Sequence, residues 1–221
     1  MMLTCRKDMG VNSTADLKGK TLGVWFYGNE YPFLSWMSRL GLKTDGSADG
    51  VTVLRQGWGV EPLTEGQAAC VSTMSYNEYW VVRDAGYSPE QLTVFKYQSE
   101  GAATLEDGLY VHEKNLSDAA FKDKMVRFVR ASMKGWKYAE ANPKEAAMII
   151  LDNDDAGVQT EKHQVRMMGE IAKLTAGSNG SLDPADYERT VKVLMSGDSD
   201  PVITKKPSGA WTNEITNAAL N

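Results

Sequence analysis

The sequence gathers aromatic, amide and carboxylate side chains into short segments, and these are the side chains that hold a flat polar molecule. Residues 25–30 read Trp-Phe-Tyr-Gly-Asn-Glu, and residues 76–79 read Tyr-Asn-Glu-Tyr. Aromatic rings stack on a planar ring, while amides, phenols and carboxylates form hydrogen bonds with its edges. Residues 55–59 add Trp58 between two glycines. The three segments therefore predict non-covalent binding of a small polar solute.

Residues suited to covalent or metal-assisted catalysis are scattered rather than grouped. The sequence contains no G-x-S-x-G, H-E-x-x-H or G-x-x-x-x-G-K motif. His112 and His163 each stand alone in their neighbourhoods, which is typical of a solvated or structural histidine. Cys5 and Cys70 are too few and too far apart for a zinc motif or a redox pair, and both a disulfide and two free buried thiols remain open. We expect no catalytic residue, no metal site and no cofactor.

The composition is that of an ordinary globular protein. Of the 221 residues, 42% are hydrophobic and 24% are charged, enough to build a sizeable core. The net charge is -5 and no basic stripe interleaves with the tryptophans, which argues against nucleic-acid binding. No apolar run approaches the roughly 20 residues of a membrane span. The first ten residues lack the apolar segment of a secretory signal, so the protein either stays inside the cell or has an export sequence outside this stretch.

Alternating strand and helix signals predict an α/β fold for the first part of the chain. Residues 21–26 form an apolar strand, a polar turn follows at Gly28, and residues 32–40 carry apolar side chains at helical spacing. The same pattern recurs as a strand over residues 51–54 and a short helix over residues 60–67. Such alternation indicates a parallel sheet with crossover helices. Further strands are predicted over residues 2–5, 68–74 and 92–95, with an extended segment over residues 108–111.

The pattern becomes helical after about residue 115. Apolar residues from Phe121 to Trp136 fall on one face of a long helix that ends before Asn142. Asn142 and Pro143 then form the N-cap and first position of another helix. Further helices are predicted to begin at Thr160, at Asp183-Pro184 and near Trp211.

In an open α/β sheet, ligands bind beyond the carboxyl ends of the strands. The three polar and aromatic segments follow predicted strands, so we expect them to meet there, with the Gly28 amide and its neighbours at a helix N-terminus. The alternatives are that the aromatics close the edge of the sheet, that Asn77 and Glu78 only cap a helix, and that Glu106 belongs to a solvated turn. The predicted ligand-binding residues are Trp25, Tyr27, Gly28, Asn29, Glu30, Trp58, Tyr76, Asn77, Glu78, Tyr79 and Glu106.

The residues of the first helix and its strand divide between core and site. Trp25, Tyr27 and the turn at Gly28 are left for the ligand. The core is predicted to take Val24 and Phe26 together with Phe33, Leu34 and Met37.

Several segments together carry a resemblance to a known family. They are ADLKGKTLGVWFYGNEYPF, the VTVL strand, GQAACVST, EDGLYV and the helical stretch FVRASMKGWKYAEANPKEAA. This order resembles the periplasmic substrate-binding proteins of ABC importers. It is most similar to the group that binds nitrate, sulfonates, taurine and pyrimidine precursors of thiamine.

The resemblance implies a periplasmic-binding-protein-like (type II) architecture, in which two α/β lobes close on the ligand. Residues 1–15 would be a hinge strand and connection, residues 16–107 the second lobe, and residues 108–221 the hinge return with the helical remainder of the first lobe. Family members begin with a signal peptide and about half of the first lobe, so the first lobe is expected to be incomplete here. An incomplete lobe would weaken binding and expose an apolar helix face, which leaves a dimer open.

The function implied is that of a non-enzymatic, extracytoplasmic binding subunit that delivers a solute to a membrane ABC permease. A small, planar, pyrimidine-like thiamine precursor is the expected ligand. A sulfonate, nitrate or taurine-type anion is the chief alternative, disfavoured mildly by Glu30 and Glu78. The thiamine pyrimidine synthases share the fold, but their cysteine-rich motif is missing from this sequence.

Overall fold

A computed structural model describes residues 1–196 and 201–220, and the chain divides into two compact units. The first, here called the sheet unit, comprises Met1–Glu106 and Ala185–Pro207. The second, the helical unit, comprises Asp107–Pro184 and the described residues from Ser208 onward. The predicted end of the α/β region at residue 107 lies next to this division. Residues 1–15 and most of the segment 185–207 also belong to the sheet unit, and the assignment of the units to lobes stays a prediction.

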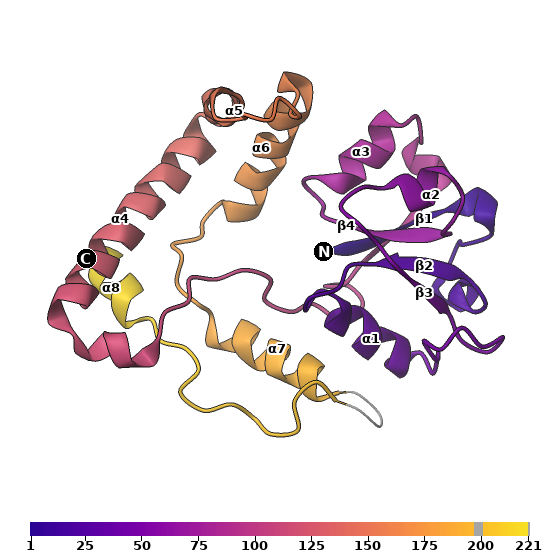
Figure 1. Cartoon of the computed structure of the whole chain (residues 1–221), viewed down its shortest axis with the longest axis horizontal. Helices are drawn as coiled ribbons and strands as arrows, with labels where there is room; N and C mark the ends of the chain where they lie inside the picture. Colours follow the sequence, from indigo (N-terminus) through magenta and orange to yellow (C-terminus); the bar gives the residue numbers. More distant parts are fainter. Residues whose placement is uncertain (197–200, 221) are drawn as a thin grey trace. The chain divides into compact units, whose positions relative to one another are not determined.

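The sheet unit contains a five-stranded sheet of order β3-β2-β4-β1-β5 (Figure 1). β2 is parallel to both β3 and β4, whereas β1 is antiparallel to β4 and β5. The predicted mixed α/β class is confirmed, but the expectation of a parallel sheet is wrong for β1, which runs against all its neighbours. The strands are β1 (Met2–Arg6), β2 (Thr21–Val24), β3 (Thr52–Arg55), β4 (Cys70–Thr73) and β5 (Leu92–Lys96).

Helices cover both faces of this sheet, because successive residues of a strand point to opposite sides. In β4, Cys70 packs into a core cluster with α1 residues such as Trp36, while Val71 packs into a second cluster with Leu63 of α2 and Val82 of α3. Figure 1 shows α1 and α3 on opposite sides of the sheet. The helices of this unit are α1 (Glu30–Arg39), α2 (Glu61–Thr64), α3 (Glu78–Asp84) and, apart from its first residue, α7 (Pro184–Met195).

The core residues predicted around the first helix are buried or partly buried. Val24, Phe33 and Met37 are fully buried, and Phe26 and Leu34 pack partly buried against the same cluster. Trp36 anchors this cluster, with its ring centroid 5.5 Å from that of Phe95. The helix predicted over residues 60–67 is shorter than expected, since α2 ends at Thr64.

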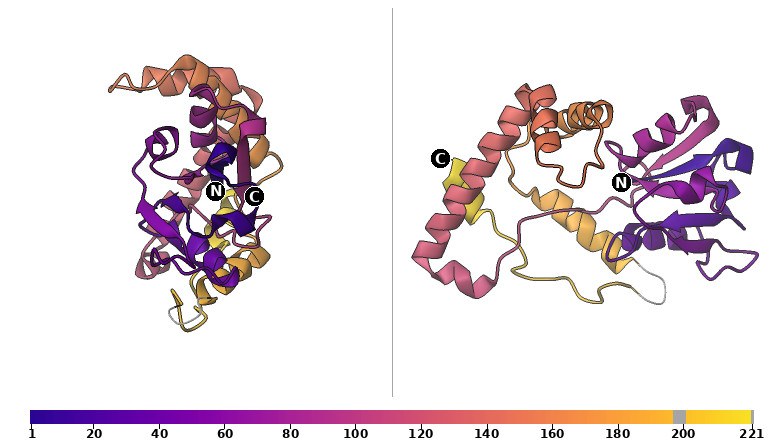
Figure 2. Two further views of the ribbon diagram at one scale, coloured as in Figure 1. Left: turned by 90° about the vertical axis from the view of Figure 1, so that its right-hand side faces the viewer. Right: turned by 45° about the horizontal axis from the view of Figure 1, so that its top comes forward.

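In its described residues, the helical unit contains four α-helices and a short 3-10 helix, Glu113–Ser117. Thr160, predicted to open a helix, accepts a hydrogen bond from the His163 amide at the start of α6, and Asp118, which was not predicted as a cap, accepts from the first amides of α4. Asn142 lies at the N-cap position of α5 as predicted, but its side chain does not cap that helix and instead donates to the Tyr138 carbonyl oxygen at 3.0 Å. Figure 2 shows α8 beside α4, with which it packs. The helices are α4 (Ala119–Ala141), α5 (Pro143–Asp152), α6 (Glu161–Thr175) and α8 (Glu214–Leu220).

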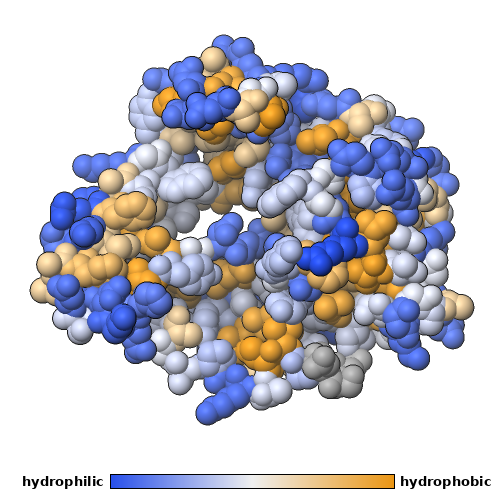
Figure 3. Space-filling model, viewed as in Figure 1, coloured by the Kyte–Doolittle hydropathy of each residue, from blue (hydrophilic) through white to orange (hydrophobic). Residues whose placement is uncertain are grey.

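Residues 108–111, predicted to be extended, form no strand, and Leu109 and Tyr110 are exposed. None of the α4 residues is buried, and Phe128 and Trp136 on its apolar face are 53% and 45% exposed. Hydrophobic residues therefore reach the surface on parts of the face drawn in Figure 3. Within the described residues, no helix is long and apolar enough to cross a membrane.

A disulfide joins Cys5 of β1 to Cys70 of β4 and settles the question that the sequence left open. The two residues are paired in the antiparallel register of these strands, and both are fully buried. The bond links segments that are 65 residues apart, so it restricts the unfolded chain.

We expect loss of this disulfide to lower the free energy of unfolding by about 4 kcal/mol, since a closed loop of this length costs the unfolded chain that much conformational entropy. Urea unfolding with and without a reductant measures the difference. The double variant Cys5→Ala/Cys70→Ala is the control, because its midpoint should not respond to reductant. Equal midpoints for the wild-type chain under both conditions would contradict the expectation.

Candidate ligand-binding site

The three segments predicted to hold a ligand begin at one edge of the sheet. β3, β2 and β4 are neighbours and parallel, so their carboxyl ends lie together. At this edge Val24 is paired with Arg55. Because β1 is antiparallel, Met2 also lies at this edge, opposite Thr73 and Lys96. Fold and register thus bring together segments that are far apart in the sequence.

Trp25 is tied to the loop that follows β3. Its Nε1 donates a hydrogen bond to the Gly57 carbonyl oxygen at 2.9 Å, and its side chain is partly exposed. Trp58, the next residue in that loop, is 95% exposed. Two predicted tryptophans therefore lie around one loop at the edge of the sheet.

Gln56, which the sequence analysis did not select, fixes this loop to β4. Its Nε2 donates to the carbonyl oxygens of Gly59 (3.1 Å) and Ser72 (3.0 Å), and its Oε1 accepts from the Ser72 amide at 2.8 Å. The side chain is buried, and buried amides are costly unless they are hydrogen-bonded in this way. Gln56 is therefore a positioning residue for the loop that carries Trp58. Gln56 lies between Arg55 and Gly57, which are both exposed. The alternation of side chains along the strand was the only signal in the sequence that Gln56 would be buried.

Tyr27 has a strained backbone and a solvent-exposed ring. It is the one non-glycine residue with positive φ among the described residues (65°), and 91% of its surface is exposed. The left-handed region is unfavourable for a side chain with a Cβ, and such strain is concentrated at functional sites. The Arg55 guanidinium carbon lies 4.9 Å from the centroid of the Tyr27 ring and 5.2 Å from that of Phe26. Arg55 is a second residue that the sequence analysis missed.

The turn after Tyr27 is already hydrogen-bonded within itself. The Gly28 amide, expected to face a ligand, donates to Glu30 Oε2 at 2.7 Å. Asn29 occupies the N-cap position of α1, but its side chain does not cap the helix and instead donates to the Phe26 carbonyl oxygen at 3.4 Å. The Glu30 carboxylate thus occupies the place where an anionic ligand group was expected.

The segment after β4 forms a similar turn. Glu78 Oε2 accepts from the Met74 amide at 2.9 Å, and Glu78 Oε1 accepts from the Asn77 side chain at 2.7 Å. Asn77 is at the N-cap position of α3 without capping it through its side chain. Tyr79 packs against the second core cluster, while Tyr76 is partly exposed.

Glu106 lies at the end of the sheet unit and accepts from the amino group of Met1, with 2.7 Å between nitrogen and Oε1. Tyr97, just beyond β5, is buried against Trp36. Burial raises the pKa of the Tyr97 phenol, so this hydroxyl stays neutral and does not act as a base near neutral pH.

The described residues at this edge offer neither a cluster of metal ligands nor a free thiol. Within residues 1–196 and 201–220, no group of three histidine, cysteine or carboxylate side chains could hold a metal ion. Both cysteines form the buried disulfide. The histidines, His112 and His163, belong to the helical unit.

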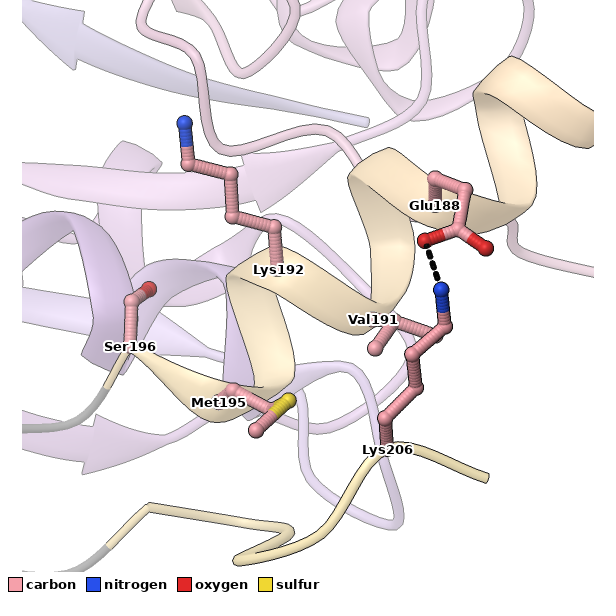
Figure 4. Close-up of a pocket in the computed structure, with 6 residues that line it drawn as sticks. All are labelled: Glu188, Val191, Lys192, Met195, Ser196 and Lys206. Carbon is pink, nitrogen blue, oxygen red and sulfur yellow. Dashed lines mark hydrogen bonds and ion pairs between the residues drawn. The ribbon is translucent and has the colours of Figure 1, made fainter. Parts of the chain in front are cut away.

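A shallow cavity of about 400 Å³ lies elsewhere in the sheet unit, beside α7 (Figure 4). Glu188 and Lys206 form an ion pair across it at 2.7 Å, and Figure 4 shows the Lys192 side chain pointing away from that pair. None of the predicted ligand-binding residues lines this cavity. Its lining residues are Glu188, Val191, Lys192, Met195, Ser196 and Lys206.

Comparison with known families identifies the chain. A family model described as NMT1/THI5 like matches residues 1–146, about two-thirds of the sequence. The chain belongs to the NMT1/THI5-like family. This family includes substrate-binding proteins, so the resemblance found in the sequence is confirmed at the level of the family. No curated protein matches the chain.

The strain at Tyr27 predicts an unusual order of stability for two variants. Tyr27→Gly should be more stable than Tyr27→Ala by about 1 kcal/mol, because both lose the ring and only alanine keeps a Cβ in the left-handed region. Urea unfolding measures the difference. The same pair of substitutions at Tyr110, which is exposed and lacks a positive φ, is the control and should favour alanine or show no preference. Equal stabilities of Tyr27→Gly and Tyr27→Ala would contradict the inference that the backbone is strained at this position.

The hydrogen bonds of Gln56 predict a large loss on truncation. Gln56→Ala should lower the free energy of unfolding by about 2–3 kcal/mol, because buried backbone groups at Gly59 and Ser72 lose their partners. Gln67→Ala is the matched control, since that side chain bonds only to Glu65 at the surface. A loss as small as that of the control would show that Gln56 does not fix the loop.

Proposed function

We propose that the chain is the solute-binding component of an ABC importer and that it binds a small planar solute at the carboxyl edge of β2, β3 and β4. The observation that carries this proposal is Tyr27, an exposed ring on a strained backbone where these strands end. Trp25 and Trp58 lie at the same edge. Exposed aromatic surface gathered at one place is typical of a binding site.

The course of the chain favours a two-lobe arrangement. Met2 and Lys96 are paired, so the start of β1 and the end of β5 lie side by side at the proposed ligand edge. Residues entering and leaving the sheet there are suited to act as the hinge of a protein that closes on its ligand. We assign residues 1–15 and the segment around residues 108–111 to this hinge, and the helical unit to the first lobe. An extracytoplasmic location and a permease partner belong to the same proposal.

A pyrimidine-like thiamine precursor is the ligand proposed first. Trp25, Tyr27 and Tyr76 would stack on or flank the ring, and the amides of Asn29 and Asn77 would reach its polar edges. A sulfonate, nitrate or taurine-type anion is the second candidate. The carboxylates of Glu30 and Glu78 count less against an anion than the sequence suggested, because both accept hydrogen bonds within their own turns.

An enzymatic role like that of the thiamine pyrimidine synthases has less support. Such a role requires accessible cysteines, and here both cysteines are buried in a disulfide within the sheet. The family match alone does not separate binding proteins from enzymes.

A ligand screen tests binding against catalysis. We expect an aminopyrimidine, taurine or nitrate to raise the melting temperature of the chain, because a ligand that binds only the folded state adds about 2.7 kcal/mol at 100 times its Kd. Mass spectrometry of the same mixtures should find no product. Conversion of a candidate would overturn the binding proposal, and the absence of any shift across the screen would count against these ligands.

Trp25→Ala should weaken binding of the ligand found in this screen by tenfold or more while lowering stability by less than about 1 kcal/mol, since the ring is partly exposed. Calorimetric titration and urea unfolding measure the two effects. Trp136→Ala removes the same kind of side chain at a position that is not among the proposed ligand-binding residues, and it should leave affinity unchanged. A large loss of stability with unchanged affinity would show that Trp25 is a core residue and not a ligand contact.

A further inference from the structure

Arg55 carries a positive charge at the carboxyl edge of the sheet, beside two aromatic rings. It is the last residue of β3, exposed at the edge where the proposed ligand binds. Within the described parts of the chain, its guanidinium forms no ion pair with a carboxylate. Its neighbours are instead the rings of Phe26 and Tyr27. No other described residue accepts a hydrogen bond from this guanidinium, whose planar fork of N–H donors is suited to bind an anion.

The two rings orient this charge without cancelling it. Guanidinium groups stack on aromatic faces, which attract the cation but accept few of its hydrogen bonds. The distances of 5.2 and 4.9 Å to the ring centroids are within the range of such contacts. The Tyr27 ring lies at this position on a left-handed backbone. The strain at Tyr27 and the unpaired charge of Arg55 are therefore parts of one arrangement.

Glu30 and Glu78, the two acids predicted at the turns of this edge, are occupied. Glu30 Oε2 accepts from the Gly28 amide at 2.7 Å, and the two oxygens of Glu78 accept from Met74 and Asn77. These carboxylates hold the turns that begin α1 and α3. The edge of the sheet therefore presents an available cation beside exposed rings, in a chain whose net charge is -5.

We propose that Arg55 is a specificity-determining residue and that the ligand is a planar ring bearing a carboxylate. The planar fork of a guanidinium matches the two oxygens of a carboxylate, and a ring attached to that group would extend beside Tyr27. This proposal rests on the proposed binding of a planar solute at this edge and changes the first candidate for that solute. It favours an aromatic acid over a neutral pyrimidine and over a small anion without a ring.

Nicotinate and nicotinamide test the proposal, since they share a ring and differ in having a carboxylate or a neutral amide. Calorimetric titration of the whole chain at pH 7.5 should show nicotinate binding at least tenfold more tightly. Arg55→Gln should abolish this preference while leaving the weaker affinity for nicotinamide. Lys96→Gln is the matched control. Like Arg55, Lys96 is an exposed positive residue at the end of its strand, but β5 and β3 are the two outermost strands on opposite sides of the sheet, so this variant should keep the preference.

The outcomes separate this proposal from the function on which it rests. Equal binding of both rings, or a preference for nicotinate that survives in Arg55→Gln, would overturn the role of Arg55 and leave the binding of planar solutes standing. Equally tight binding of pyridine-3-sulfonate would overturn the assignment of a carboxylate. Binding of acetate with neither ring bound, or the absence of all binding to these probes, would overturn the assignment of an aromatic acid, while the proposed function is tested separately by the screen with an aminopyrimidine, taurine and nitrate. Unfolding curves confirm that the variants are folded.

Discussion

The position of β1 is the constraint on which the sheet unit depends. β1 is hydrogen-bonded to β4 on one side and to β5 on the other, and it alone joins β5 to the parallel strands. Its register places Cys5 opposite Cys70, so a covalent bond reinforces the pairing. A slip of one residue would turn the buried side chains of β1 to the wrong faces. The geometry of the proposed site depends on this register, because the site lies at the edge formed by the ends of β1, β2, β3 and β4.

The edge of the sheet combines rigid supports with exposed rings. Gln56 holds the loop after β3, and Glu30 and Glu78 hold the turns after β2 and β4, each through short hydrogen bonds to backbone groups. The rings of Tyr27 and Trp58 are left in water. Exposed aromatic surface and a left-handed tyrosine both cost stability, and a binding site is the usual reason for keeping them. Acidic residues that look like ligand contacts in the sequence are here part of the scaffold.

The helical unit is stabilised differently, through polar contacts between helices as well as apolar ones. Arg130 of α4 donates from Nε and Nη2 to the carbonyl oxygens of Ala219 and Ala218 at the end of α8. Lys122 pairs with Glu214 at the other end of α8. A cation at a helix C-terminus satisfies carbonyl groups that have no partner within the helix. These contacts hold α8 against α4 even though α4 buries none of its own residues.

Sequence patterns predicted the parts of the structure that depend on local chemistry. Periodicity located α4, and Thr160 was predicted to open α6. Apolar alternation placed Val24 and Phe26 in the core, where they are buried or partly buried. The antiparallel direction of β1 was missed, because strand propensity carries no information on direction. Gln56 and Arg55 were missed for a related reason. Arg55 is paired with Val24, which lies 31 positions earlier in the chain, and Gln56 follows directly after Arg55. The roles of both residues depend on this pairing, which exists only once the sheet has formed.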